Sequence, residues 1–304
     1  MKLKITLYSV CLLMLLAACQ QDGPTPEPSV GSRTVLVYMI AQNSLAPLAS
    51  ADIEEMKEGM RQVDATSGNL LVYIDDYSAP RLIRLGKDKK GKVVEETIEN
   101  YPEQNSADAN VMKKVISTAF NQYKAEKYGM VFWSHGEGWI PSPAKTRWFG
   151  QDGNNYMDIA DLHAALQVAP DLDFLFFDAC FMEAVEVAYA LRDCGSYLIS
   201  SPTEIPGPGA PYQTVVPAMF SAENAALKIA SCYYDYYQSR YNDGIGMSNE
   251  DWTGGVSVGV AKMSELENLA VATSKVLPRY ITGKQNFDLS GVMCYRSEEH
   301  TSEL

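Results

Sequence analysis

Two short apolar runs, each followed by a reactive side chain, constrain the fold of this chain more than any other feature. Residues 129–133 lead toward His135, and residues 172–177 lead toward Cys180. Runs of this length and composition are typical of buried parallel strands. Two adjacent parallel strands that end in His135 and Cys180 would bring both side chains to the carboxyl edge of one sheet, where ligands bind in open α/β folds.

The segments around these two runs alternate between apolar strand patterns and helical patterns. We expect strands at 34–40, 69–74, 129–133, 172–177, 196–201 and 255–262, with amphipathic helices between most of them. This alternation predicts an α/β fold with a mostly parallel sheet covered by helices on both faces. We expect loops at 137–156 and 202–211, and a helix over 182–192 that starts directly after Cys180.

The N-terminus carries the pattern of an export signal. Lys2 and Lys4 precede the apolar stretch 5–16, which is too short to span a bilayer comfortably. The stretch Leu-Ala-Ala-Cys that ends at Cys19 resembles a bacterial lipobox, and this resemblance implies that Cys19 becomes the lipidated first residue. We therefore expect a protein of the bacterial cell envelope, attached to a membrane through the lipid on Cys19.

The remaining boundaries follow from composition. After a signal peptide over 1–19, the polar and proline-containing segment 20–33 is typical of a flexible tether. We expect one folded domain over 34–295. The last nine residues, 296–304, match one reading frame of a common sequencing adapter, so we expect the native chain to continue past Tyr295.

Charge and cysteine spacing narrow the classes of partner. The formal net charge of −13 makes the exported chain a poor binder of nucleic acid and suits it to basic substrates. The cysteines show no metal-site spacing. The segment 152–158 is rich in oxygen ligands but lacks the spacing of an EF-hand loop, so we assign no metal ion or other cofactor.

A cysteine beside a histidine can carry out acyl transfer. The Cys180 thiolate would attack a carbonyl carbon while the His135 imidazole transfers protons. Gly136 allows close approach of a backbone N–H, which together with the N–H of Cys180 could form an oxyanion hole. The electropositive start of a helix over 182–192 would lower the pKa of the thiol. We expect no chemical role for His163, which lies on a predicted helix surface.

Around these residues the chain resembles the clostripain family of caspase-like cysteine peptidases. The matching stretches are 133–139, 177–183 and 200–209, together with Tyr212. The resemblance implies a caspase-like three-layer α/β sandwich, in which His135 is the base and Cys180 the nucleophile of an endopeptidase that cuts after Arg or Lys. Some relatives require calcium, but the resemblance points to no calcium site in this chain.

An acidic pocket would explain a preference for basic side chains through charge pairing. Asp178 lies two residues before Cys180 and on the same side of the strand, which makes it the first candidate for substrate binding. Glu204, in the loop after the next predicted strand, is the second. Relatives are often activated by cleavage between the two catalytic residues, and here Lys145 and Arg147 are the candidate self-cleavage sites.

Two other functions fit the same residues. The chain could be a non-catalytic surface binding protein that keeps the caspase-like fold and the unused dyad. It could also be an acyltransferase or ligase, since a thioester intermediate can pass its acyl group to an amine instead of water.

Overall fold

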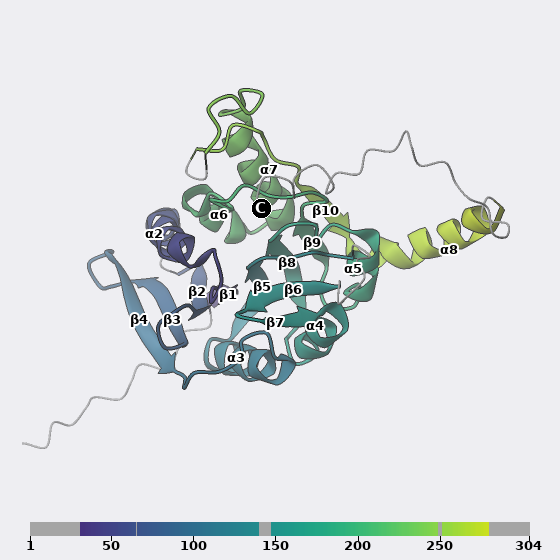
Figure 1. The fold of residues 1–304 in the computed structure, drawn as a ribbon. Helices are drawn as coiled ribbons and strands as arrows, with labels where there is room; N and C mark the ends of the chain where they lie inside the picture. The colour runs from purple at the N-terminus through teal and green to yellow at the C-terminus, as the bar shows by residue number, and fades with distance from the viewer. Residues whose placement is uncertain (1–30, 65, 140–146, 249–250, 280–304) are drawn as a thin grey trace, which may run out of the picture.

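An eight-stranded sheet forms the centre of the molecule (Figure 1). The computed structural model describes residues 31–64, 66–139, 147–248 and 251–279. The strands of the central sheet are β1 (Gly31–Ile40), β2 (Gly68–Asp75), β3 (Arg81–Lys87), β4 (Val93–Asn100), β5 (Ala125–Trp133), β8 (Leu172–Asp178), β9 (Tyr197–Ser200) and β10 (Gly259–Lys262). Their order across the sheet is β10-β9-β8-β5-β1-β2-β3-β4. The pairs from β2 across to β9 are parallel, whereas β3 pairs antiparallel with β2, β4 with β3, and β10 with β9.

Helices cover both faces of this sheet and make it the middle of three layers (Figure 1). One face is covered by α2 (Ala46–Gln62), α6 (Tyr212–Met219) and α7 (Ala225–Gln238). The other is covered by α3 (Ala109–Gln122), α4 (Ile159–Leu166) and α5 (Val185–Ala190), and α8 (Leu266–Val276) packs against α5. Short 3-10 turns at Met263–Glu265 and Leu277–Arg279 flank α8.

The burial of β1 explains why both faces need a layer of helices. Val37 and Met39 pack into the core beneath α2 and α6, whereas Leu36 and Tyr38 pack into the core on the side of α3. Successive side chains of a strand point to opposite faces, so a strand that is apolar at every position must be covered on both. The mostly parallel α/β fold predicted from the sequence is thus confirmed.

Several elements differ from the prediction, among them the last strand, β10, which spans Gly259–Lys262 and not 255–262. Strand β1 begins at Gly31, so residues 31–33 belong to the sheet and not to the tether. The expected loop over 137–156 contains β6 (Trp148–Asp152), which pairs with β7 (Asn155–Asp158) in a second, two-stranded sheet. Helix α6 follows the 202–211 loop and was not predicted. The three missed elements are short, with five residues in β6, four in β7 and eight in α6, and short segments give a weak periodic signal in the sequence.

Side-chain caps define where two of the helices begin. The Asp108 carboxylate accepts hydrogen bonds from the backbone of Asn110 and Val111 at the start of α3, and Asp158 does the same for Ala160 at the start of α4. Among the described residues, no helix combines the length and the apolar character needed to cross a membrane.

Candidate active site

The register of the central strands places His135 and Cys180 side by side. Trp133 at the end of β5 pairs with Asp178 at the end of β8. His135 and Cys180 each lie two residues beyond this pair, and neighbouring strands are about 4.8 Å apart. Both side chains are partly exposed to solvent. The structure therefore brings the two residues predicted as base and nucleophile to the same carboxyl edge of the sheet.

Two glycines allow the loop after β5 to pack directly on the loop after β8. A Cβ atom at Gly136 would lie 2.9 Å from the carbonyl oxygen of Cys180, and one at Gly138 would lie 2.1 Å from that of Phe181. Gly138 also has a φ of +55°, which favours glycine. Any other residue at either position would push the two loops apart, so the His-Gly-Glu-Gly sequence is a packing requirement as well as part of the site.

The backbone hydrogen bonds that join the loop after β5 to strand β6 do not use the N–H of Gly136. Glu137 donates to the Trp148 carbonyl at 3.1 Å and Gly150 donates to the His135 carbonyl at 2.9 Å. These two bonds lie on either side of the bridge between Gly136 and Phe149. They use backbone groups of the residues before and after Gly136. This geometry is compatible with the predicted oxyanion role of Gly136, which stays a prediction together with that of the Cys180 N–H.

The turn that carries Cys180 differs from the expected start of a helix. Helix α5 begins only at Val185, because Phe181 has a left-handed φ of 62° and Ala184 is extended. The helix predicted over 182–192 is present as α5 but spans only Val185–Ala190, so it does not start directly after Cys180; the lowering of the thiol pKa by a helix terminus stays a prediction. The backbone N–H of Ile205 approaches the Cys180 sulfur at 3.4 Å. The Phe181 N–H donates to the Thr203 carbonyl at 2.9 Å and ties the turn to the loop after β9.

The His135 imidazole has a partner that the sequence did not reveal. Its Nε2 lies 2.8 Å from the hydroxyl oxygen of Ser44, which lies in the segment between β1 and α2. A hydroxyl that accepts from Nε2–H would leave Nδ1 as the basic nitrogen. Ser44 is far from His135 in the sequence, and no local pattern distinguishes it from other serines.

Asp178 lies beneath the site, buried and fully engaged by hydrogen-bond donors. Its carboxylate accepts from the backbone N–H of Ala210 at 3.0 Å, from the Tyr212 hydroxyl at 2.9 Å and from the Tyr233 hydroxyl at 3.3 Å. Burial raises its pKa to about 6, and these donors partly offset that rise. Asp178 therefore holds the loop that follows β9 against the end of β8, whether or not substrate also senses its charge.

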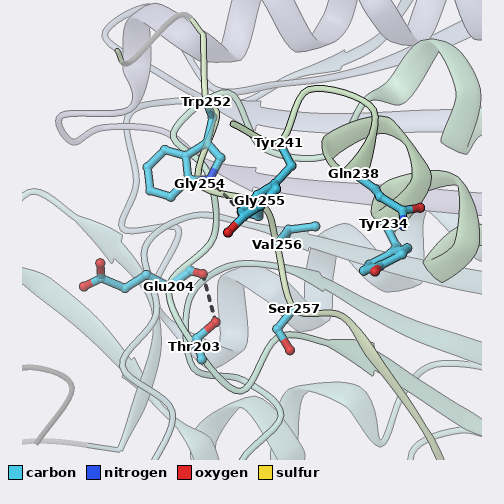
Figure 2. Close-up of a pocket in the computed structure, with 10 residues that line it drawn as sticks. All are labelled: Thr203, Glu204, Tyr234, Gln238, Tyr241, Trp252, Gly254, Gly255, Val256 and Ser257. Atoms are coloured by element: carbon cyan, nitrogen blue, oxygen red, sulfur yellow. Dashed lines mark hydrogen bonds between the residues drawn. The ribbon is translucent and has the colours of Figure 1, made fainter. Parts of the chain in front are cut away.

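Glu204 lines a cavity of about 530 Å³, and the backbone N–H of its chain neighbour Ile205 contacts the Cys180 sulfur. The other side of this cavity is lined by aromatic side chains of α7 and the following loop, namely Tyr234, Tyr241 and Trp252 (Figure 2). Figure 2 shows the Glu204 carboxylate directed away from these rings. The sequence prediction named Glu204 but missed the aromatic wall, which comes from residues some thirty to fifty positions later in the chain.

The two candidate self-cleavage sites differ in what the structure describes. Lys145 lies outside the described residues. Arg147 is exposed, and its guanidinium stacks 4.2 Å above the centre of the Trp139 ring. Its carbonyl accepts the N–H of Ile159 at 2.9 Å, so the backbone at Arg147 is anchored on one side.

Two carboxylates of the oxygen-rich segment 152–158 accept backbone hydrogen bonds within the fold. Asp152 accepts from the Ser106 N–H at 2.6 Å, and Asp158 caps α4. The expectation that the chain needs no metal at this segment stays a prediction. Cys19, with its expected lipid, and the tail 296–304 both lie outside the described residues.

Several known proteins are similar to this chain. Residues 37–303 match the model of the clostripain family. Clostripain of Hathewaya histolytica is 28% identical over 217 residues, a match that covers 60% of this chain and 41% of that protein. The chain thus spans about two fifths of the length of this curated relative.

Two solved structures resemble this one. A secreted C11 cysteine protease from Bacteroides thetaiotaomicron, in complex with an irreversible peptide inhibitor, is 56% identical with a TM-score of 0.78, covering 82% of this chain and 71% of its own. An inactive zymogen C11 protease from Parabacteroides distasonis is 36% identical with a TM-score of 0.69, covering 82% and 67%.

Proposed function

Because this chain belongs to the clostripain family, we propose that it is a cysteine endopeptidase with Cys180 as nucleophile and His135 as base. The observation that carries the proposal is the common offset of both residues from the Trp133–Asp178 pair of two adjacent parallel strands. That offset brings a thiol and an imidazole together at an accessible edge, as nucleophilic catalysis requires.

The residues support a two-step acyl transfer. The imidazole takes the proton of the Cys180 thiol, and the thiolate attacks the carbonyl carbon of the scissile peptide bond. The N–H groups of Gly136 and Cys180 stabilise the oxyanion. The imidazolium of His135 then protonates the leaving amine, which leaves a thioester. A water molecule that gives its proton to His135 attacks this thioester and releases the acid product.

We further propose that the peptidase prefers Arg or Lys on the acyl side of the cleaved bond. Burial and the nearby charge of Asp178 raise the pKa of Glu55, and burial raises that of Asp178, so the region below the site is rich in poorly solvated carboxyl groups. A cationic side chain would relieve that unfavourable charge. Glu204 adds a further carboxylate one residue before Ile205, whose backbone N–H contacts the Cys180 sulfur.

We propose that the lipid on Cys19 attaches the protein to a membrane of the cell envelope. The support is the lipobox-like sequence and the related Bacteroides thetaiotaomicron protein, which is described as secreted. No nucleic acid or cofactor enters the proposed reaction.

Fluorogenic peptides that end in Arg, Lys, Asp or Leu test the peptidase directly. We expect cleavage after Arg or Lys by the wild type and loss of that cleavage in Cys180→Ala, together with labelling of Cys180 by an irreversible thiol probe that carries an Arg side chain. A folded protein that neither cleaves nor is labelled would instead be a binding protein. Ligated product in the presence of an added amine would indicate acyl transfer in place of hydrolysis.

Self-cleavage between the catalytic residues is the second expectation. We expect the wild type to yield two fragments that stay associated, because β5 and β8 lie on opposite sides of the cut and pair in the same sheet. Cys180→Ala should stay intact. Comparing Arg147→Ala with Lys145→Ala by mass spectrometry identifies the cleaved bond, whereas equal fragmentation of wild type and Cys180→Ala would show that another protease cuts the chain.

A further inference from the structure

A second group of polar side chains lies at the opposite edge of the sheet from Cys180. His163 lies on α4, and Asp193 and Cys194 lie in the turn between α5 and β9. Three possible ligand atoms, the His163 Nε2, an Asp193 carboxylate oxygen and the Cys194 sulfur, all lie within 4.8 Å of one another. Strand β8 has seven residues, so about 20 Å separates this cluster from the dyad.

The separations within this cluster are close to those of a metal site. His163 Nε2 lies 2.9 Å from Asp193 Oδ1, and the Cys194 sulfur lies 3.8 Å from the same oxygen. Ligand atoms around a tetrahedral zinc ion lie about 3.3–3.6 Å apart, given Zn–S and Zn–N distances of about 2.3 and 2.0 Å. Small rotations of the exposed Asp193 and partly exposed His163 side chains would bring the three atoms, which lie within 4.8 Å of one another, into that range.

One residue of the cluster is buried and the other two are accessible to solvent, so that a metal ion could reach the site. Cys194 is 8% exposed, whereas His163 and Asp193 face solvent. The cluster borders a hollow of about 490 Å³, which Gln167 and Asp171 also line.

We propose that His163, Asp193 and Cys194 bind a divalent transition-metal ion of the zinc class. A water molecule, or the side-chain oxygen of Gln167, would complete four ligands. Gln167 contacts both His163 and Cys194 through its amide nitrogen, so a flip of the amide would present the oxygen. Thiolate and imidazole ligands favour zinc over calcium or magnesium. On binding, the sulfur–hydrogen bond is replaced by a sulfur–metal bond and the proton goes to solvent.

The bound ion would fasten α4 to the turn before β9. It would act on stability and not on the chemistry of the dyad, which lies at the other edge. This site was not predicted from the sequence, which assigned His163 no role, because the ligands come from segments thirty residues apart and show no metal-site spacing.

Metal titration of the full chain tests the proposal. The protein should carry both Cys180→Ala and His135→Ala, so that the dyad can neither bind zinc nor cleave the chain. After treatment with a chelator, Zn²⁺ is titrated against a chromophoric competitor, and Co²⁺ binding is followed through the thiolate charge-transfer band. We expect one ion per chain, a cobalt–thiolate band and a raised Tm with Zn²⁺, and no Tm shift with Ca²⁺.

Single substitutions in this background locate the ion. Cys194→Ser should abolish the cobalt–thiolate band, and His163→Gln should weaken zinc binding by more than about 100-fold, since loss of outer-shell partners alone costs about 10–100-fold. Asp171→Asn, which alters a carboxylate of the same hollow outside the cluster, should bind as tightly as the parent. Circular dichroism of the metal-free variants checks that each is folded.

Two results would overturn the proposal. If the parent takes up no zinc, the cluster is an ion pair with a hydrogen-bonded thiol. If zinc binds equally to the parent and to Cys194→Ser, the ion occupies another part of the surface. Failure of Cys194→Ser to fold leaves the test to Asp193→Asn, whose side chain is exposed and whose loss of metal affinity is then the deciding result.

Discussion

At the residue scale, the dyad depends on how its imidazole is held. Ser44 reaches His135 Nε2 at 2.8 Å from a segment that contributes nothing else to the proposed chemistry. A base transfers protons efficiently only when its ring is oriented toward the nucleophile and carries the correct tautomer. Ser44 is therefore a positioning residue in the proposed mechanism and not a catalytic one.

We expect Ser44→Ala to lower kcat by about 5–10-fold, which corresponds to loss of one hydrogen bond of about 1 kcal/mol. KM should change little, and the pH at which kcat reaches half its maximum should shift because the imidazole loses a partner. Ser44→Thr, which keeps the hydroxyl, should restore most of the rate. Steady-state kinetics across pH measure both effects.

Ser50→Ala, an exposed serine on α2, is the matched control and should behave as wild type. A raised KM with unchanged kcat in Ser44→Ala would show that Ser44 contacts substrate and does not orient His135.

Single residues also show how much of the candidate site could be predicted from the sequence. His135 and Cys180 were predicted as the dyad because each follows a buried apolar run, and the register of β5 and β8 brings them to one edge of the sheet. Asp178 was predicted as a substrate-binding residue by the same logic. Its donors Ala210, Tyr212 and Tyr233 were not assigned to it, because they come from α6, α7 and the loop before them and meet Asp178 only through the packing of one layer on the sheet.

At the scale of elements, long apolar strands were predictable and short elements were not. The strands β1, β2 and β8 and the second half of β5, residues 129–133, are largely buried on both faces and show apolar runs. Helix α5 was placed too early because the positions from Met182 onward fit a helical pattern. The left-handed turn at Phe181 is imposed by contact with the loops of β5 and β9, which local sequence does not encode.

Helix α2 is joined to the end of β5 by a buried pair. The Asp52 carboxyl accepts from the Trp133 indole N–H at 2.6 Å. Burial, together with the charge of Asp178, raises the Asp52 pKa to about 9, so Asp52 is protonated in the folded protein at neutral pH. A group whose pKa is raised on folding stabilises the fold fully below its unfolded pKa near 4, and that stabilisation is lost as the pH rises toward 9.

We therefore expect the free energy of unfolding of the wild type to fall between about pH 7.5 and about pH 9. Asp75 and Asp178 also have raised pKa values, but these lie below this pH window. Asp52→Asn keeps an acceptor for Trp133 but has no charge to bury. It should match the wild type to within about 1 kcal/mol at neutral pH and lose less stability at the alkaline end. Denaturant unfolding at each pH gives the free energies.

Asp52→Ala removes the acceptor and should be about 1–3 kcal/mol less stable than Asp52→Asn at every pH, because a buried indole N–H is left unsatisfied. Identical alkaline losses in wild type and Asp52→Asn would show that Asp52 is already ionised at neutral pH.

At the scale of the whole molecule, the charge of the chain bears on how substrate arrives. The formal net charge is −13 and the isoelectric point is about 4.7. A field of one sign attracts oppositely charged ligands before contact and is screened over about 8 Å at physiological ionic strength. The charge distribution and the proposed preference for basic residues thus act in the same direction, one on encounter and the other on binding.

The effect of charge on encounter can be separated from its effect on binding by measuring kcat/KM at different salt concentrations. For a peptide with Arg at the cleaved bond and further basic residues beside it, we expect kcat/KM to fall about 3–10-fold from low to physiological salt, because screening weakens the long-range attraction. A peptide with the same Arg and acidic neighbours should show a weaker or reversed dependence, while cleavage of both still requires Cys180. Equal salt curves for the two peptides would mean that only the carboxylates around the site select the basic residue.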